Sequence, residues 1–104
     1  MTEIDIYKYD RGQYNNGSYH EVTNINLLLE ELDENILKNF PNLIKLDCSE
    51  NDIRDLSSLQ YCKRLTELYC GYNSIIDLSP LRYCTGLTIL YCGNNLIIKD
   101  LNPL

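Results

Sequence analysis

Five cysteines lie between positions 48 and 92, and thiols at this density suggest metal binding or disulfide bonding. A zinc site needs four ligands that converge on one point at about 2.3 Å. Cys48, Cys70 and Cys92 instead recur every 22 residues, a spacing that stacks them in a row about 4.8 Å apart. No C-x-x-C pair is present, and His20 is the only histidine. We therefore expect no metal and no cofactor, and interpret the cysteines, Cys62 and Cys84 included, as buried reduced thiols.

Acidic residues offer a second kind of chemistry, because paired carboxylates can act as general acid and base. Asp55 and Asp77 recur at the spacing of the cysteines, but each stands at a turn that needs a short hydrogen-bond acceptor. The chain also contains no G-x-S-x-G, no H-E-x-x-H and no glycine-rich phosphate loop that opens a helix. The sequence therefore predicts that the protein is not an enzyme.

The charge balance limits the kinds of partner. The 104 residues carry a net charge of -6 and a pI near 4.6, which is opposite to the charge of nucleic-acid binders and of proteins that bind anionic membranes. No apolar run approaches the roughly 18 residues of a membrane span, and no export signal opens the chain. The odd number of cysteines favours a reducing compartment. We expect a cytoplasmic, intracellular protein with no nucleic-acid or membrane partner.

A 22-residue unit repeats three times and must position these groups. It begins at Leu43, Leu65 and Leu87, and each copy has Leu, Leu, Cys, Asn and Ile at positions 1, 4, 6, 9 and 11. Positions 1, 4 and 6 should point inward from a short strand, so that stacked units form a parallel sheet over apolar ladders. The asparagines at position 9 should satisfy main-chain groups where the chain leaves the strand. The return limbs, rich in Ser and Pro, predict turns or 3₁₀ segments, with Tyr61 and Tyr83 as packing residues.

The unit resembles the leucine-rich repeat, whose signature is L-x-x-L-x-L-x-x-N/C-x-L. Its spacing and its D-L-S-P-L segment are similar to the short class in internalins and phosphatase-regulatory proteins. Its Cys- and Asn-rich composition is similar to that of repeat proteins of giant viruses and protists. Departures are Cys at the third Leu position and an extra residue near Lys99. The resemblance implies an α/β solenoid with a parallel concave sheet, protein recognition without catalysis and, for a viral chain, a location in the host cytoplasm.

The chain upstream follows the pattern less closely. Residues 22–42 read as a degenerate first repeat, followed by repeats 43–64, 65–86 and 87–104 in one leucine-rich repeat domain, 22–104. Within the first repeat, residues 33–40 predict a short helix before Pro41. In residues 1–21, the alternation from Ile4 to Tyr9 and the turn at Asn16-Gly17 predict an N-terminal β-hairpin that caps the solenoid.

The solvent-facing strand positions are the candidate partner-binding site. Tyr69 and Tyr91 should stand side by side, and amphipathic aromatic residues of this kind are enriched at protein interfaces. Aromatic residues also favour strands for structural reasons alone, so both interpretations stay open. The candidate residues are Lys45, Asp47, Glu67, Tyr69, Tyr72, Ile89, Tyr91 and Asn94.

Two alternatives concern other surfaces. The last repeat breaks off while it should still be turning back, so Leu101 and Leu104 could form a self-association surface of a homodimer or larger homo-oligomeric assembly protein. Residues 1–39 carry eight acidic and three basic residues, a balance of -5, and could instead bind a basic partner as a host-directed adaptor. Salt would weaken that interaction, because exposed charges are screened within about 8 Å at physiological ionic strength.

Overall fold

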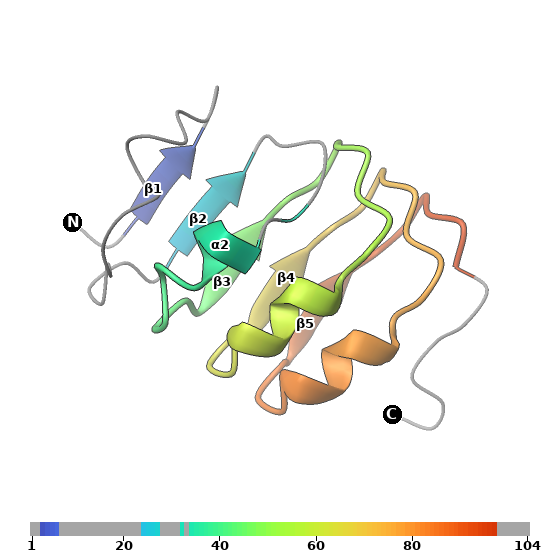
Figure 1. Ribbon diagram of the computed structural model, residues 1–104. Helices are drawn as coiled ribbons and strands as arrows, with labels where there is room; N and C mark the ends of the chain where they lie inside the picture. Colours follow the sequence, from blue (N-terminus) through green and yellow to red (C-terminus); the bar gives the residue numbers. More distant parts are fainter. Residues whose placement is uncertain (1–2, 7–23, 28–31, 33, 98–104) are drawn as a thin grey trace.

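The computed structural model describes residues 3–6, 24–27, 32 and 34–97 of the chain. Five short strands form one sheet, and the segments between them carry one helical turn and two 3₁₀ helices (Figure 1). The elements in chain order are β1 (Glu3–Ile6), β2 (Asn24–Leu27), α2 (Glu34–Leu37), β3 (Lys45–Asp47), η1 (Ser57–Tyr61), β4 (Glu67–Tyr69), η2 (Ser79–Tyr83) and β5 (Ile89–Tyr91).

The strands are all parallel and lie in chain order, β1 to β5. The register aligns Leu46 with Leu68 and Leu68 with Leu90, which are the position 4 residues of successive repeats. Ile25 aligns with Leu46, at the position that the sequence pattern assigned to it. Each repeat therefore contributes one strand, and residues 22 positions apart in the sequence become partners on adjacent strands.

The core lies between the sheet and the segments that return to it. As predicted, the side chains at positions 1, 4 and 6 of the first two full repeats are completely buried. They are Leu43, Leu46, Cys48, Leu65, Leu68 and Cys70. The corresponding residues of the third repeat, Leu87, Leu90 and Cys92, are half-buried and pack against this core.

The return limbs form the 3₁₀ helices that the sequence favoured, η1 and η2, and both lie with α2 on one side of the sheet (Figure 1). Asp77 Oδ1 accepts a hydrogen bond of 2.8 Å from the main-chain N–H of Ser79, and Asp55 does the same for Ser57. Aspartate is a favoured residue for turns of this kind. The acceptor role predicted for Asp55 and Asp77 is thus confirmed.

The prediction that Tyr61 and Tyr83 are packing residues is wrong. Their exposed fractions are 37% and 48%. In a 3₁₀ helix, side chains three residues apart lie on one face, so the buried Leu59 and Cys62 form the inward face of the η1 limb, and Tyr61 between them points away. Lys38 Nζ lies 4.9 Å from the centroid of the Tyr61 ring, so this ring meets a cation instead of the core.

The asparagines at position 9 form the predicted ladder. Asn73 Nδ2 donates to the carbonyl oxygens of Cys48 and Cys70, both at 3.0 Å. Asn95 Nδ2 repeats this pattern with Cys70 at 3.0 Å and Cys92 at 2.9 Å. Each amide therefore joins its own repeat to the preceding one where the chain leaves the strand.

The N-terminal strand differs from expectation in its partner. β1 pairs in parallel with β2, with Ile4 opposite Ile25, and so extends the repeat sheet by one strand. The turn and second arm of the expected hairpin fall in residues 7–21, outside the described residues, so the hairpin itself stays a prediction. The residues proposed for self-association, Leu101 and Leu104, also lie outside the described residues.

The helix expected over residues 33–40 is shorter, α2 at Glu34–Leu37. Leu37, in the helix, and Phe40, three residues after it, are both buried. The N–H of Phe40 donates a hydrogen bond to the Leu37 carbonyl at 3.1 Å. A tight turn thus brings Phe40 into the core before Pro41. Asp33, the first residue of the expected helix, lies outside the described residues.

Candidate functional site

The face of β3, β4 and β5 opposite to the 3₁₀ helices, here called the open face, carries the predicted site. Successive side chains of a strand point to opposite faces. Leu46 and Leu68 are buried in the core, so their strand neighbours lie on the other face. The register arranges these neighbours in two rows: Lys45, Glu67 and Ile89 in one, and Asp47, Tyr69 and Tyr91 in the other. Six of the eight predicted residues therefore lie together on this face.

Tyr69 and Tyr91 stack at the centre of the open face. Their ring centroids are 5.4 Å apart and their planes differ by 12°, which confirms that the two rings stand side by side. Tyr91 remains 64% exposed. Lys45 Nζ lies 5.5 Å from the centroid of Tyr69, which is within cation–π range. A cation and two aromatic rings therefore follow one another across three adjacent strands.

The hydroxyl of Tyr69 donates a hydrogen bond of 2.9 Å to Glu67 Oε1. This bond raises the pKa of Tyr69, and desolvation and the nearby charges of Glu67 and Asp47 act in the same direction. The Glu67 carboxylate thus holds the Tyr69 phenol in its protonated, hydrogen-bonded form.

The chain leaves each strand through a residue in the left-handed region: Glu50 at φ 60°, Tyr72 at φ 56° and Asn94 at φ 58°. Asn tolerates this conformation, whereas a Tyr there is unusual and costs about 1 kcal/mol. Tyr72 is also 62% exposed, so burial does not compensate for the strain. Tyr72 and Asn94, the last two predicted site residues, thus stand beside the open face at the ends of β4 and β5.

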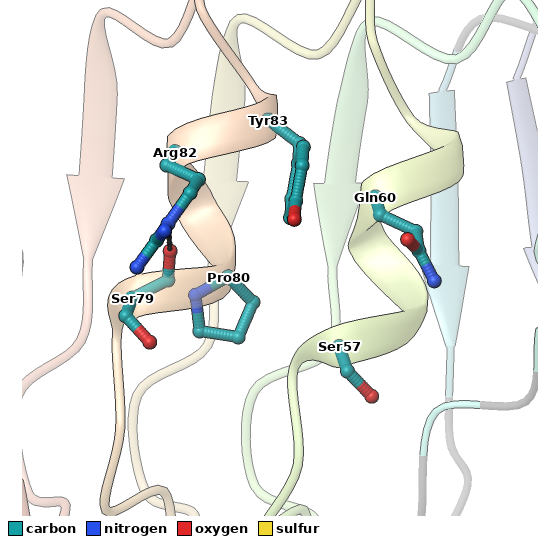
Figure 2. Close-up of a pocket in the computed structure, with 6 residues that line it drawn as sticks. All are labelled: Ser57, Gln60, Ser79, Pro80, Arg82 and Tyr83. Carbon is teal, nitrogen blue, oxygen red and sulfur yellow. Dashed lines mark hydrogen bonds between the residues drawn. The ribbon is translucent and has the colours of Figure 1, made fainter.

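A groove of about 330 Å³ lies on the opposite side of the molecule, between η1 and η2. Figure 2 shows its lining, with Tyr83 and Pro80 of η2 on one side and Gln60 and Ser57 of η1 on the other. Arg82 Nε donates to the Ser79 carbonyl at 3.1 Å, within η2 itself. The groove was not predicted from the sequence, because the spacing of its residues does not show which of them the 3₁₀ helices turn outward.

The cysteines are free thiols, and all except Cys92 are buried. Burial raises the pKa of Cys62 and Cys70 to about 12, with the neighbouring cysteine of the next repeat acting in the same direction. These thiols are therefore neutral at physiological pH and poor nucleophiles. Within the described residues, no cluster of three or more His, Cys, Asp or Glu side chains could hold a metal ion.

The repeats identify the family. The family model for leucine-rich repeats (2 copies) matches residues 41–83 and 63–104, so the chain belongs to the leucine-rich repeat family. A comparison with curated proteins found no match. Leucine-rich repeats generally mediate protein–protein interactions and are typically non-catalytic, and proteins that contain them typically bind protein partners. Among the described residues, no helix has the length and hydropathy needed to cross a membrane.

Proposed function

We propose that this protein is a non-catalytic interaction module that binds a protein partner through the open face of its sheet. The observation that carries this proposal is the tyrosine stack. Tyr69 and Tyr91 are rigid, amphipathic and arranged on adjacent strands, and Tyr91 is largely solvent-exposed. Aromatic groups of this kind provide a large contact area at little entropic cost and are enriched among binding hot spots.

The geometry of Tyr72 supports the same role. A left-handed tyrosine with 62% exposure stabilises the fold less than the Asn found at the equivalent position 94. Strain of this kind gathers at functional sites, where the side chain serves something other than folding. We therefore include Tyr72 in the contact surface.

The area of the open face limits how stable a complex it can form alone. Its three strands, about 4.8 Å apart and about 10 Å long, cover roughly 140 Å², well below the roughly 800 Å² per partner of a standard interface. A stable complex therefore requires that the partner also contacts the residues that follow the strands, Glu50, Tyr72 and Asn94. A partner that contacts the strands alone forms a weak and transient complex.

The test compares two pairs of tyrosines on opposite sides of the molecule. Tyr69→Ala with Tyr91→Ala removes the stack, and Tyr61→Ala with Tyr83→Ala removes the rings beside η1 and η2. Proteins captured from source-cell extract by the tagged chain are quantified by mass spectrometry. We expect a partner that the first variant loses by at least about tenfold and the second retains. A partner that only the second variant loses would overturn the proposal.

The alternative function, a homo-oligomeric assembly protein, is supported by exposed apolar residues in the last described repeat. Leu96 is 65% exposed and Ile89 38%. Light scattering over a range of concentrations tests it, with Leu96→Lys as the variant. A dimer that the lysine dissociates would make self-association the leading function, and a monomer at every concentration would remove it.

A further inference from the structure

The open face combines tyrosine rings with carboxylates. Asp47 is the cross-strand neighbour of Tyr69, and Glu67 lies on the same strand and binds the Tyr69 hydroxyl. Beyond the strands, Glu50 and Tyr72 occupy equivalent positions of successive repeats, and both are exposed. Tyr69 and Tyr72 therefore each have at least one acidic neighbour.

The charge of this face is negative. Asp47, Glu50 and Glu67 are acidic, and Lys45 is the one basic side chain among the described open-face residues. The hydrogen bond to Glu67 raises the pKa of Tyr69, and the charges of Glu67 and Asp47 act in the same direction, which agrees with this charge balance.

The rings already interact with a cation. Lys45 Nζ lies 5.5 Å from the Tyr69 centroid, although no ion pair fixes it there among the described residues. Such contacts are stabilising at exposed sites, and guanidinium groups stack on rings better than ammonium groups. Tyr91 and Tyr72 present similar rings, each more than 60% exposed.

Space for a partner main chain exists next to the rings. The row beyond Tyr69 and Tyr91 consists of Gly71 and Gly93, which have no side chains. A Cβ at Gly93 would meet no atom within 4 Å, whereas a Cβ at Gly71 would lie 3.3 Å from the Gly93 carbonyl oxygen, so the open space is the one at Gly93. An extended segment can therefore approach the sheet at Gly93 and place its side chains on the neighbouring tyrosines.

From these four observations we propose that the partner segment is basic and extended, and that its arginine side chains stack on Tyr91 and Tyr72, on the side of the sheet that carries the carboxylates of Asp47, Glu50 and Glu67. The inference rests on the proposed function, because it names the chemistry of the partner of the same face. It is distinct from recognition by the acidic N-terminal segment, since the residues that carry it belong to β3, β4, β5 and the turns after them.

Three model peptides of equal length test the chemistry directly on the intact chain. They are acetylated and amidated (Gly-Arg)₄, (Gly-Lys)₄ and (Gly-citrulline)₄, in which citrulline keeps the planar shape of arginine without its charge. NMR titration at low salt measures each dissociation constant and locates the binding site. We expect the arginine peptide to shift signals of Tyr69, Tyr72 and Tyr91, and to bind about threefold tighter than the lysine peptide and at least about tenfold tighter than the citrulline peptide.

Two variants separate the rings from the carboxylates. Asp47→Asn with Glu67→Gln keeps side-chain shape and should weaken binding of the arginine peptide about fivefold and flatten its salt dependence. Tyr91→Leu should weaken binding about threefold, and Tyr83→Leu, on the other side of the molecule, should leave it unchanged.

The inference is overturned if the citrulline or lysine peptide binds as tightly as the arginine peptide, if neither open-face variant weakens binding, if the shifts centre on Tyr83, or if no peptide binds. Its failure is distinguishable from failure of the proposed function. A natural partner lost with Tyr69→Ala and Tyr91→Ala would keep the open face as the binding site even when arginine peptides do not bind it.

Discussion

The amide of Asn73 bonds main-chain groups of two repeats. Its Nδ2 donates to the Cys48 and Cys70 carbonyls, and its Oδ1 accepts from the N–H groups of Asn51 at 3.0 Å and Ile53 at 3.1 Å. Asn73 is only 8% exposed, so water cannot replace these bonds easily. One side chain thus satisfies polar groups at the point where the sheet ladder ends.

Asn73→Ala should therefore lower the free energy of unfolding by about 3 kcal/mol, because it removes the hydrogen bonds that join the two repeats and takes away the acceptor of the buried Ile53 N–H. Urea unfolding followed by circular dichroism measures the loss. Asn94→Gly is the matched control, since Asn94 is exposed and glycine accepts its positive φ. A loss below about 1 kcal/mol for Asn73→Ala would show that the ladder is not a principal stabilising feature.

The buried thiols make stability depend on pH. The pKa of Cys62 rises from an ordinary 9.0 to about 12, mainly through desolvation. Between these two values the unfolded chain has lost the proton and the folded chain retains it. The thiol therefore contributes its full stabilisation below pH 9, and this is lost as the pH rises towards 12, by about 1.4 kcal/mol per pH unit.

Cys62→Ala removes this contribution, and other groups that titrate in the same range stay the same. The variant is less stable overall, but its free energy of unfolding should fall less steeply between pH 9 and 11 than that of the wild type. Urea unfolding at several pH values measures both slopes. Equal slopes would mean that the thiol is as accessible to water as in the unfolded chain.

The two 3₁₀ helices have equivalent positions in their repeats and differ at two of five residues, Gln60 against Arg82 and Ser58 against Pro80. Pro80 stands near the start of η2, and Ser58 takes the equivalent position in η1. Ser58 is 7% exposed, and its buried hydroxyl has no hydrogen-bond partner among the described residues. Leu59 and Leu81 donate equivalent main-chain bonds, to Leu56 at 2.9 Å and to Leu78 at 3.0 Å. The backbone of η1 is therefore suited to proline.

Ser58→Pro should raise the free energy of unfolding by about 1 kcal/mol. The substitution removes an unpaired buried hydroxyl and restricts the unfolded chain. The reverse change, Pro80→Ser, should lower stability by a similar amount, and chemical denaturation measures both. A destabilised Ser58→Pro protein would show that η1 and η2 differ in backbone geometry despite their common pattern.

Elements that repeat were predictable, and elements that occur once were less so. Leu, Cys and Asn recur at fixed positions in three copies, so their inward placement followed from the spacing. Tyr61 and Tyr83 also recur, but their orientation depends on the period of a 3₁₀ helix that the sequence does not display. The parallel pairing of β1 was missed, although Ile4 and Ile6 precede Ile25 and Leu27 by 21 residues, because Ile-Asp-Ile-Tyr alternates as a hairpin arm also does.

The candidate site was predictable as a face but not as an arrangement of groups. Strand alternation placed Lys45, Tyr69 and Tyr91 on the open face from the sequence alone. The stacking of the two rings and the position of Lys45 over Tyr69 depend on rotamers, which the spacing does not determine. The left-handed backbone at Tyr72 was also invisible in the sequence, since glycine and asparagine are the residues that normally mark it.

At the scale of the whole molecule, the fold has two distinct sides. Three helical segments lie on one side of the sheet (Figure 1), and Tyr69, Tyr91 and the carboxylates of Asp47 and Glu67 lie on the other. Stacking of equal units creates this division, because every repeat places its return limb on the same side. The central claim, that the uncovered side binds a partner, is therefore a claim about which of two sides makes contact.

Site-specific photo-crosslinking tests this claim most directly. A benzophenone amino acid replaces either Tyr91, on the open face, or Tyr83, beside η2, and the tagged chain is irradiated in extract of its source cell. We predict a covalent adduct with a single different protein from position 91 and none from position 83. Adducts from position 83 alone, or an adduct at position 91 with the mass of two copies of this chain, would contradict the account.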